Sequence, residues 1–175
     1  MQADYFKHDQ MKRKIVLIRH GKSAPMDAFK KDIDRVLQER GVNDGYKIGY
    51  KLVEDGVKPE AILTSPAARA SHTALILARA MRIGTDIVRV ADGLYHCTTD
   101  SILEEISSLP DSIGTVFVVA HNPGITDLAY HLSRGATTFL PTTGTAIIEY
   151  NGVPWKDISN QEPEKYTFIK PRELL

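Results

Sequence analysis

An apolar run near the start of the chain ends in three residues of very different chemistry, and this order constrains the fold more than any other feature. Residues 14–18, with the sequence KIVLI, are followed directly by Arg19, His20 and Gly21. A run rich in β-branched residues predicts a parallel strand that is buried on both faces. Ligands of open α/β sheets bind at the carboxyl ends of such strands. The sequence therefore predicts that Arg19 and His20 face a crevice at one end of a sheet.

Short apolar runs alternate with segments of helical periodicity along the rest of the chain. Strands are expected over residues 61–64, 87–90, 115–120, 145–150 and 166–170, the last at an edge of the sheet. Helices are expected over residues 27–40, 43–56, 65–82, 99–108 and 125–132, with Gly41 ending the first of them. In the helix over 65–82, Leu75, Ile76, Ala78 and Met81 are expected to face the core. This alternation predicts the α/β class, as a three-layer α/β/α sandwich around a mostly parallel sheet with 115–120 at its centre.

Composition limits the possible organisation and partners. The chain has 175 residues, 42% of them hydrophobic, which suits a single domain over residues 14–175. Residues 1–13 are polar and without period, so an N-terminal extension that includes His8 is expected there. The 22 basic and 22 acidic residues cancel, so no global field favours nucleic acid or an anionic membrane. Cys97 is the only cysteine, which excludes an intrachain disulfide, and no apolar leader or membrane span is seen, so cytoplasmic residence is expected.

Two further positions are expected to meet Arg19 and His20. His121 directly follows the apolar run 115–120, just as His20 follows the run 14–18. Arg69 lies in the first turn of a helix that begins after residues 61–64, where free N–H groups and the helix dipole favour anions. Forked arginine donors and imidazoles around a helix N-terminus suit a tetrahedral oxyanion, and phosphate is the common one.

At these residues the chain resembles the histidine phosphatase superfamily, which contains phosphoglycerate mutases and acid phosphatases. Within that superfamily it is most similar to the small phosphohistidine phosphatases of the SixA type. The matching stretches run in order along nearly the whole chain: Arg19-His20-Gly21-Lys22-Ser23, Asp34-Arg35 with Leu37, Arg40-Gly41, Ser65-Pro66-Ala67 with Arg69-Ala70, Thr73-Ala74, His121-Asn122-Pro123-Gly124 and Pro141-Thr142.

The resemblance implies a phosphoglycerate mutase-like fold and an enzyme in which His20 takes the phosphoryl group. Arg19, Arg69 and His121 would then bind the phosphoryl oxygens, and water would hydrolyse phosphorylated His20. A neutral imidazole is a competent nucleophile near pH 7, and a hydrogen bond from its other ring nitrogen to a backbone carbonyl would fix the tautomer. No metal ion and no cofactor are required, and the histidines show no metal-ligand spacing.

Three neighbouring residues could complete such a site. Ser23 and Asn122 are candidates for further phosphate-binding donors, with a turn-stabilising role as the alternative. Lys22 is a candidate for a charge at the substrate rim that attracts anions, with a solvated loop cation as the alternative.

The substrate is less constrained than the reaction. Many relatives carry a Glu or Asp after the third strand that protonates the leaving oxygen, but residues 91–100 (ADGLYHCTTD) lack that acidic pattern, as SixA-type proteins do. Asp92, His96 and Asp100 remain candidates for a proton donor. A weak or absent acid favours labile N–P bonds, so a phosphohistidine protein is the expected substrate and partner. The alternatives are a small phosphate ester or anhydride and, from another class, a noncatalytic module that binds a phosphorylated partner.

Overall fold

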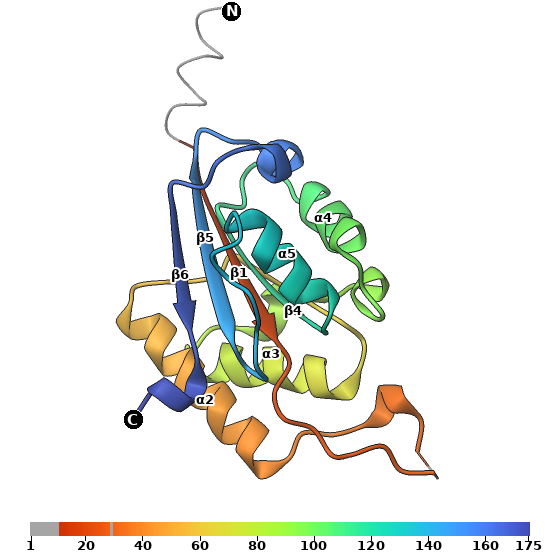
Figure 1. The fold of residues 1–175 in the computed structure, drawn as a ribbon. Helices are drawn as coiled ribbons and strands as arrows, with labels where there is room; N and C mark the ends of the chain where they lie inside the picture. Colours follow the sequence, from red (N-terminus) through yellow and green to blue (C-terminus); the bar gives the residue numbers. More distant parts are fainter. Residues whose placement is uncertain (1–10, 29) are drawn as a thin grey trace, which may run out of the picture.

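A computed structural model describes residues 11–28 and 30–175 of the protein, and its centre is a six-stranded sheet with helices on both faces (Figure 1). The strands are β1 (Lys12–Arg19), β2 (Ala61–Thr64), β3 (Val88–Val90), β4 (Thr115–Ala120), β5 (Thr145–Asn151) and β6 (Lys165–Ile169), in the spatial order β3-β2-β4-β1-β5-β6. The first four run parallel to one another, whereas β5 is antiparallel to β1 and to β6. The predicted three-layer fold, its mostly parallel sheet and its edge strand are confirmed.

The alternation of side chains along the central strands builds the two outer layers. In β1, Ile15 and Leu17 pack into one core, against α4 (Thr99–Ser107) and α5 (Gly124–Leu132). Val16 and Ile18 pack into the other, against α2 (Glu39–Glu54) and α3 (Ala68–Ala80). All four side chains are fully buried, as expected for a strand covered on both faces. No helix in the described part of the chain is long and apolar enough to cross a membrane.

The start of the sheet lies earlier than predicted. β1 begins at Lys12 rather than at residue 14, and Arg13 is almost fully buried, so these two residues belong to the sheet and not to an extension. The Arg13 guanidinium donates to the backbone oxygen of Asp111 at 2.9 Å and lies over the ring of Trp155. The rest of the proposed extension, with His8, lies outside the described residues.

The helix predicted over residues 27–40 is wrong. Among the described residues before Glu39, the segment forms only a short 3-10 turn, η1 (Asp32–Asp34), and α2 begins at Glu39 instead of near residue 43. The segment is tied to the loop after β1, because Arg35 donates to the Ala24 carbonyl at 2.8 Å and to the Ser23 hydroxyl at 3.0 Å. These tertiary contacts override the helical spacing of its apolar residues.

Gly41, which was expected to end a helix, lies inside α2 and serves a packing role there. Gly41 is buried inside α2, and a Cβ at this position would lie 2.3 Å from the backbone oxygen of Lys22. The glycine therefore permits a close approach between the loop after β1 and the first turn of α2.

The buried face of α3 agrees with the prediction at Ala78 and differs from it at the other three positions. Leu75 is 42% exposed, and Ile76 and Met81 are only partly buried. The core side of the helix consists of Leu77 and of small residues, namely Ala70, Thr73, Ala74 and Ala78. Small residues fit there because α2 and α3 pack closely: a Cβ added at Gly49 would lie only 2.5 Å from the Cβ of Ala80.

Candidate functional site

Two parallel strands at the centre of the sheet bring the predicted histidines together. β1 and β4 are hydrogen-bonded neighbours with Arg19 opposite Ala120, so His20 and His121 leave the sheet side by side. The backbone N–H of His20 donates to the Ala120 carbonyl at 3.1 Å. The two imidazole ring centroids lie 5.0 Å apart. The structure thus places both rings at the carboxyl end of the parallel strands, where the sequence predicts the crevice.

The surroundings of His20 fix its tautomer and its charge. Its Nδ1 lies 2.8 Å from the carbonyl oxygen of Gly21, and because a carbonyl only accepts, Nδ1 carries the proton and Nε2 keeps a free lone pair. Burial is the largest influence on the His20 pKa, which is lowered to about 4. The contact with Gly21 opposes this shift, while the nearby cations Arg69 and Arg19 add to it. His20 is therefore a neutral imidazole at pH 7.

His121 contacts the residue that follows β2. Its Nε2 lies 2.7 Å from the hydroxyl oxygen of Ser65, the residue that follows β2. Burial, then the proximity of His20 and Arg69, lowers the pKa of His121 to about 3. Within the described residues its buried Nδ1 has no hydrogen-bond partner. An unpaired buried ring nitrogen is unusual, and a bound ligand would satisfy it.

Arg69 lies in the first turn of α3, as predicted, and is anchored by an acid that the sequence analysis did not single out. Its guanidinium donates to the Asp32 backbone oxygen at 2.7 Å and to the Asp32 carboxylate at 3.0 Å. The same carboxylate accepts from Arg35 at 2.9 Å and from the Tyr95 hydroxyl at 2.9 Å. Burial raises the pKa of Asp32, but these three donors together hold it well below its ordinary value.

Arg19 completes the group from the end of β1. Its terminal nitrogen donates to the Leu140 carbonyl at 3.1 Å, and its guanidinium lies 5.8 Å from the centre of the Phe139 ring. The Arg19 carbonyl in turn accepts from the backbone N–H of Thr143 at 2.9 Å. Thr143 is buried with a left-handed φ of 61°, a strained conformation for a β-branched residue. The structure therefore brings Arg19, His20, Arg69 and His121 to one end of the sheet.

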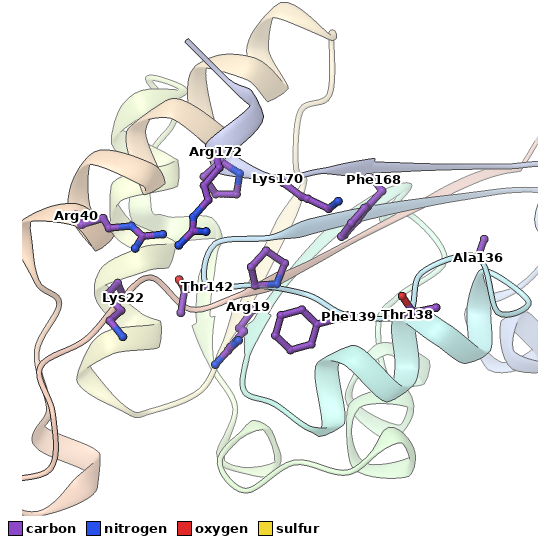
Figure 2. A pocket seen from close by; sticks show the side chains of 12 residues that line it. Arg19, Lys22, Arg40, Ala136, Thr138, Phe139, Thr142, Phe168, Lys170 and Arg172 are labelled. Carbon is purple, nitrogen blue, oxygen red and sulfur yellow. The ribbon is translucent and has the colours of Figure 1, made fainter.

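The three auxiliary candidates have different surroundings. Ser23 is buried and accepts from Arg35 at 3.0 Å. The Asn122 amide donates to the Leu140 carbonyl at 3.3 Å, and its oxygen accepts from the Thr126 hydroxyl at 2.6 Å. These contacts favour the turn-stabilising alternative for both residues. Lys22 is exposed and lines the pocket beside Arg19 (Figure 2).

The three candidate proton donors differ in how close they lie to the histidine pair. Asp92 and Asp100 are exposed and, within the described residues, make no hydrogen bond or ion pair with the histidine pair. The His96 ring lies 4.0 Å from that of Tyr95, which is 5.8 Å from the ring of His121. His96 is thus the candidate that the fold brings nearest to the site.

Sequence reasoning missed Asp32 and Tyr95. Asp32 stands just before the Asp34-Arg35 match, but the helix predicted there hid its place beside Arg69. Nothing in the spacing of Tyr95 indicates that its hydroxyl reaches Asp32, which lies 63 positions earlier in the chain.

A comparison with known families agrees with this geometry. The model of the histidine phosphatase superfamily (branch 1) matches residues 15–94, which include Arg19, His20 and Arg69. The uncharacterized protein Rv1276c of Mycobacterium tuberculosis is 32% identical over 152 residues, which cover 81% of this chain and 91% of that protein. The chain belongs to the histidine phosphatase superfamily.

Solved structures place it within the fold range of that superfamily. The protein histidine phosphatase SixA, solved with tungstate, has a TM-score of 0.76 at 20% identity, covering 91% of this chain and 98% of SixA. Phosphoglycerate mutase from Bacillus anthracis has a TM-score of 0.66 at 15% identity, covering 89% of this chain and all of the mutase chain. The fold is thus SixA-like and phosphoglycerate mutase-like. Among the described residues, no group of three His, Cys, Asp or Glu side chains is placed to hold a metal ion.

Proposed function

We propose that this member of the histidine phosphatase superfamily is a metal-independent phosphatase that works through a phosphohistidine intermediate on His20. The observation that carries the proposal is the 2.8 Å contact between His20 Nδ1 and the Gly21 carbonyl. It directs the free lone pair of Nε2 away from the backbone, and the lowered pKa keeps that nitrogen unprotonated at neutral pH. A fixed, neutral imidazole beside cationic donors is a prepared nucleophile.

Arg19, Arg69 and His121 have the role of stabilising the phosphoryl group during transfer. The Nε atoms of both arginines and Nδ1 of His121 are buried and unpaired within the described chain. Donors that are already desolvated stabilise developing charge without reorganising, and loss of one commonly costs about 100-fold in rate. Asp32 has a positioning role, because its carboxylate and backbone oxygen orient the Arg69 guanidinium.

The reaction proceeds in two displacements. Nε2 of His20 attacks phosphorus, the bond to the leaving atom breaks, and the leaving group departs with the electron pair. Water then attacks the same phosphorus, the P–N bond breaks with its electron pair returning to Nε2, and phosphate is released. Both steps place negative charge on the same oxygens, so one set of donors supports both.

Protein phosphohistidine is the substrate we propose first. The carboxylate that anchors Arg69, Asp32, is held ionised by Arg35, Tyr95 and Arg69, so it is a poor proton donor. A phosphohistidine leaving group is an imidazole, which needs less help from an acid than an alkoxide. A relative of the same fold is a protein histidine phosphatase. A small phosphate ester or anhydride is the second candidate, favoured by the pocket that adjoins Arg19.

Trapping the phosphoenzyme tests the reaction. Turnover of ³²P-labelled phosphoramidate, stopped with alkaline detergent because phosphohistidine is labile in acid, should leave label on His20. His20→Ala should lose both label and turnover while keeping its fold, whereas His72→Ala, an exposed histidine on α3, should behave as wild type. Label on another residue, or an active His20→Ala enzyme, would refute the assignment. Binding of phosphate without turnover of any substrate would indicate the noncatalytic module instead.

A rate series over phosphoramidate, an aryl phosphate and an alkyl phosphate tests the leaving-group argument. An acid normally contributes about 100-fold or more, so kcat/KM should fall by at least that factor from phosphoramidate to the alkyl ester. Alanine variants of Asp92, His96 and Asp100 should change phosphoramidate turnover only modestly. Equal efficiency on the alkyl ester, with collapse in one variant, would identify a hidden acid and favour an ester substrate.

A further inference from the structure

A cavity of about 680 Å³ adjoins the site on the side of Arg19 (Figure 2). Twelve residues line it, and none of them is acidic. Its cations are Arg19, Lys22, Arg40, Lys170 and Arg172. The whole chain carries 22 basic and 22 acidic residues, so this positive charge is a local feature and not a consequence of composition. We call this cavity the basic pocket.

The fold gathers these cations from separate segments of the chain. Lys22 follows β1, Arg40 lies in the first turn of α2, Lys170 follows β6, and Arg172 belongs to the 3-10 turn η5 (Pro171–Glu173). Figure 2 shows the Arg40 and Arg172 side chains extending toward each other at one end of the pocket, with Lys22 beside them.

Close backbone packing fixes one pair of these cations. The Gln38 N–H donates to the Lys22 carbonyl at 2.8 Å, and the missing Cβ of Gly41 lets the two backbones touch. Lys22 and Arg40 are therefore held on a rigid support rather than on free loops.

Little of this charge is neutralised by the protein itself. Arg40 meets Asp44 at 3.5 Å and Lys170 meets Glu173 at 3.3 Å, and both contacts leave the cations lining the pocket. Among the described residues, Lys22 and Arg172 have no ion pair. Like charges gathered in one concave site repel one another, so an anion bound there relieves that repulsion.

We infer that the basic pocket is a subsite for a second phosphate, and that it selects small phosphoanhydrides whose terminal phosphoryl group is transferred to His20. This inference rests on the proposed phosphatase chemistry and gives its second substrate candidate a defined site. Arg19 belongs both to the histidine group and to the wall of the basic pocket. One ligand can therefore contact the histidine group and the pocket at the same time. The cavity volume is in the range of small-molecule sites, which are about 300–1,000 Å³. Phe139 and Phe168 supply faces for an organic group attached to the diphosphate.

A phosphoanhydride also fits a site without an effective acid. Nε2 of His20 forms a bond to the terminal phosphorus, and the bond from that phosphorus to the bridging oxygen breaks. The bridging oxygen keeps the electron pair and leaves as part of the remaining phosphate, a monoester from ADP and inorganic phosphate from pyrophosphate, which is a stable anion and needs no proton at that moment. The guanidinium groups of Arg40 and Arg172 stabilise this added charge in place of an acid. Water then hydrolyses phosphorylated His20 as before.

The test compares a diphosphate with an ester of similar reactivity that lacks the second phosphate. ADP and inorganic pyrophosphate serve as anhydride probes, and p-nitrophenyl phosphate as the reference. Arg40→Gln/Arg172→Gln removes two charged donors at the far end of the pocket. Loss of a hydrogen bond to a charged group commonly weakens binding about tenfold or more. The ratio of kcat/KM on ADP to that on p-nitrophenyl phosphate should therefore fall about 100-fold in the double variant.

Arg89→Gln is the matched control, because Arg89 is an exposed arginine on β3, at the opposite edge of the sheet from β6. It should leave the ratio unchanged. The inference is overturned if the wild-type enzyme hydrolyses phosphoramidate but neither anhydride, or if the ratio is the same in the double variant. It is also overturned if the double variant loses activity only on an acidic phosphohistidine protein, which would make the pocket a protein-docking site. Loss of labelled His20 with every substrate would instead refute the proposed function itself.

Discussion

Acidification should destabilise the wild-type protein more than a His20→Gln variant. An unfolded histidine has a pKa near 6.5, whereas burial lowers the pKa of folded His20 to about 4. Between these values the unfolded chain binds a proton that the folded chain does not. The contribution of neutral His20 to the free energy of unfolding is therefore fully present above pH 6.5 and is lost as the pH falls toward 4. From pH 7 to pH 5 the loss amounts to about 2 kcal/mol, at about 1.4 kcal/mol per pH unit below the unfolded pKa.

Urea denaturation at pH 7 and pH 5 measures this effect. The variant lacks the His20 imidazole, so its free energy of unfolding should fall by about 2 kcal/mol less than that of the wild type over the same interval. His72→Gln, which removes an exposed imidazole and leaves both buried ones, should keep the wild-type difference. An identical pH dependence for wild type and His20→Gln would show that folded His20 titrates normally. The argument for a neutral, desolvated nucleophile would then fail.

Two further outcomes follow from the packing and the donor set. Gly41→Ala should lower the free energy of unfolding by about 1–3 kcal/mol, measured by urea denaturation, because its Cβ would meet the Lys22 backbone at 2.3 Å; unchanged stability would show that the helix shifts freely. Tungstate should inhibit competitively and chelators should leave turnover unchanged, because Arg19, Arg69 and His121 supply the oxyanion donors without a metal bridge; activity lost with a chelator and restored by added metal would contradict this.

Local sequence signals predicted much of the fold because burial strongly restricts which residues can form a central strand and where that strand can end. The fully buried strand β4 is a run of apolar and β-branched residues, and it ends at the position that the sequence predicts. The histidines could be paired because β1 and β4 each end just before one of them and parallel strands align their ends.

The rest could not be predicted because it depends on contacts between distant residues. Residues 27–40 have helical spacing, but Arg35 reaches back to Ala24 and Asp32 reaches forward to Arg69 and Tyr95. A long-range ion pair leaves no periodic trace in the sequence. The basic pocket cannot be predicted from the sequence for the same reason, since two of its cations, Lys22 and Arg172, are 150 positions apart in the chain.

Several structural features that lower stability lie at one end of the sheet. His20 and His121 are buried, His121 Nδ1 is unpaired within the described chain, and Thr143 is held in a left-handed conformation. Each feature lowers stability, yet the strands that lead to the two histidines are regularly paired and are fully buried over residues 15–18 and 116–120. Desolvated oxyanion donors without partners, at the ends of a buried and regularly paired strand pair, are complementary to a ligand rather than to the protein itself. Bound phosphoryl oxygens would supply the missing partners, so the local instability and the proposed catalysis have the same physical origin.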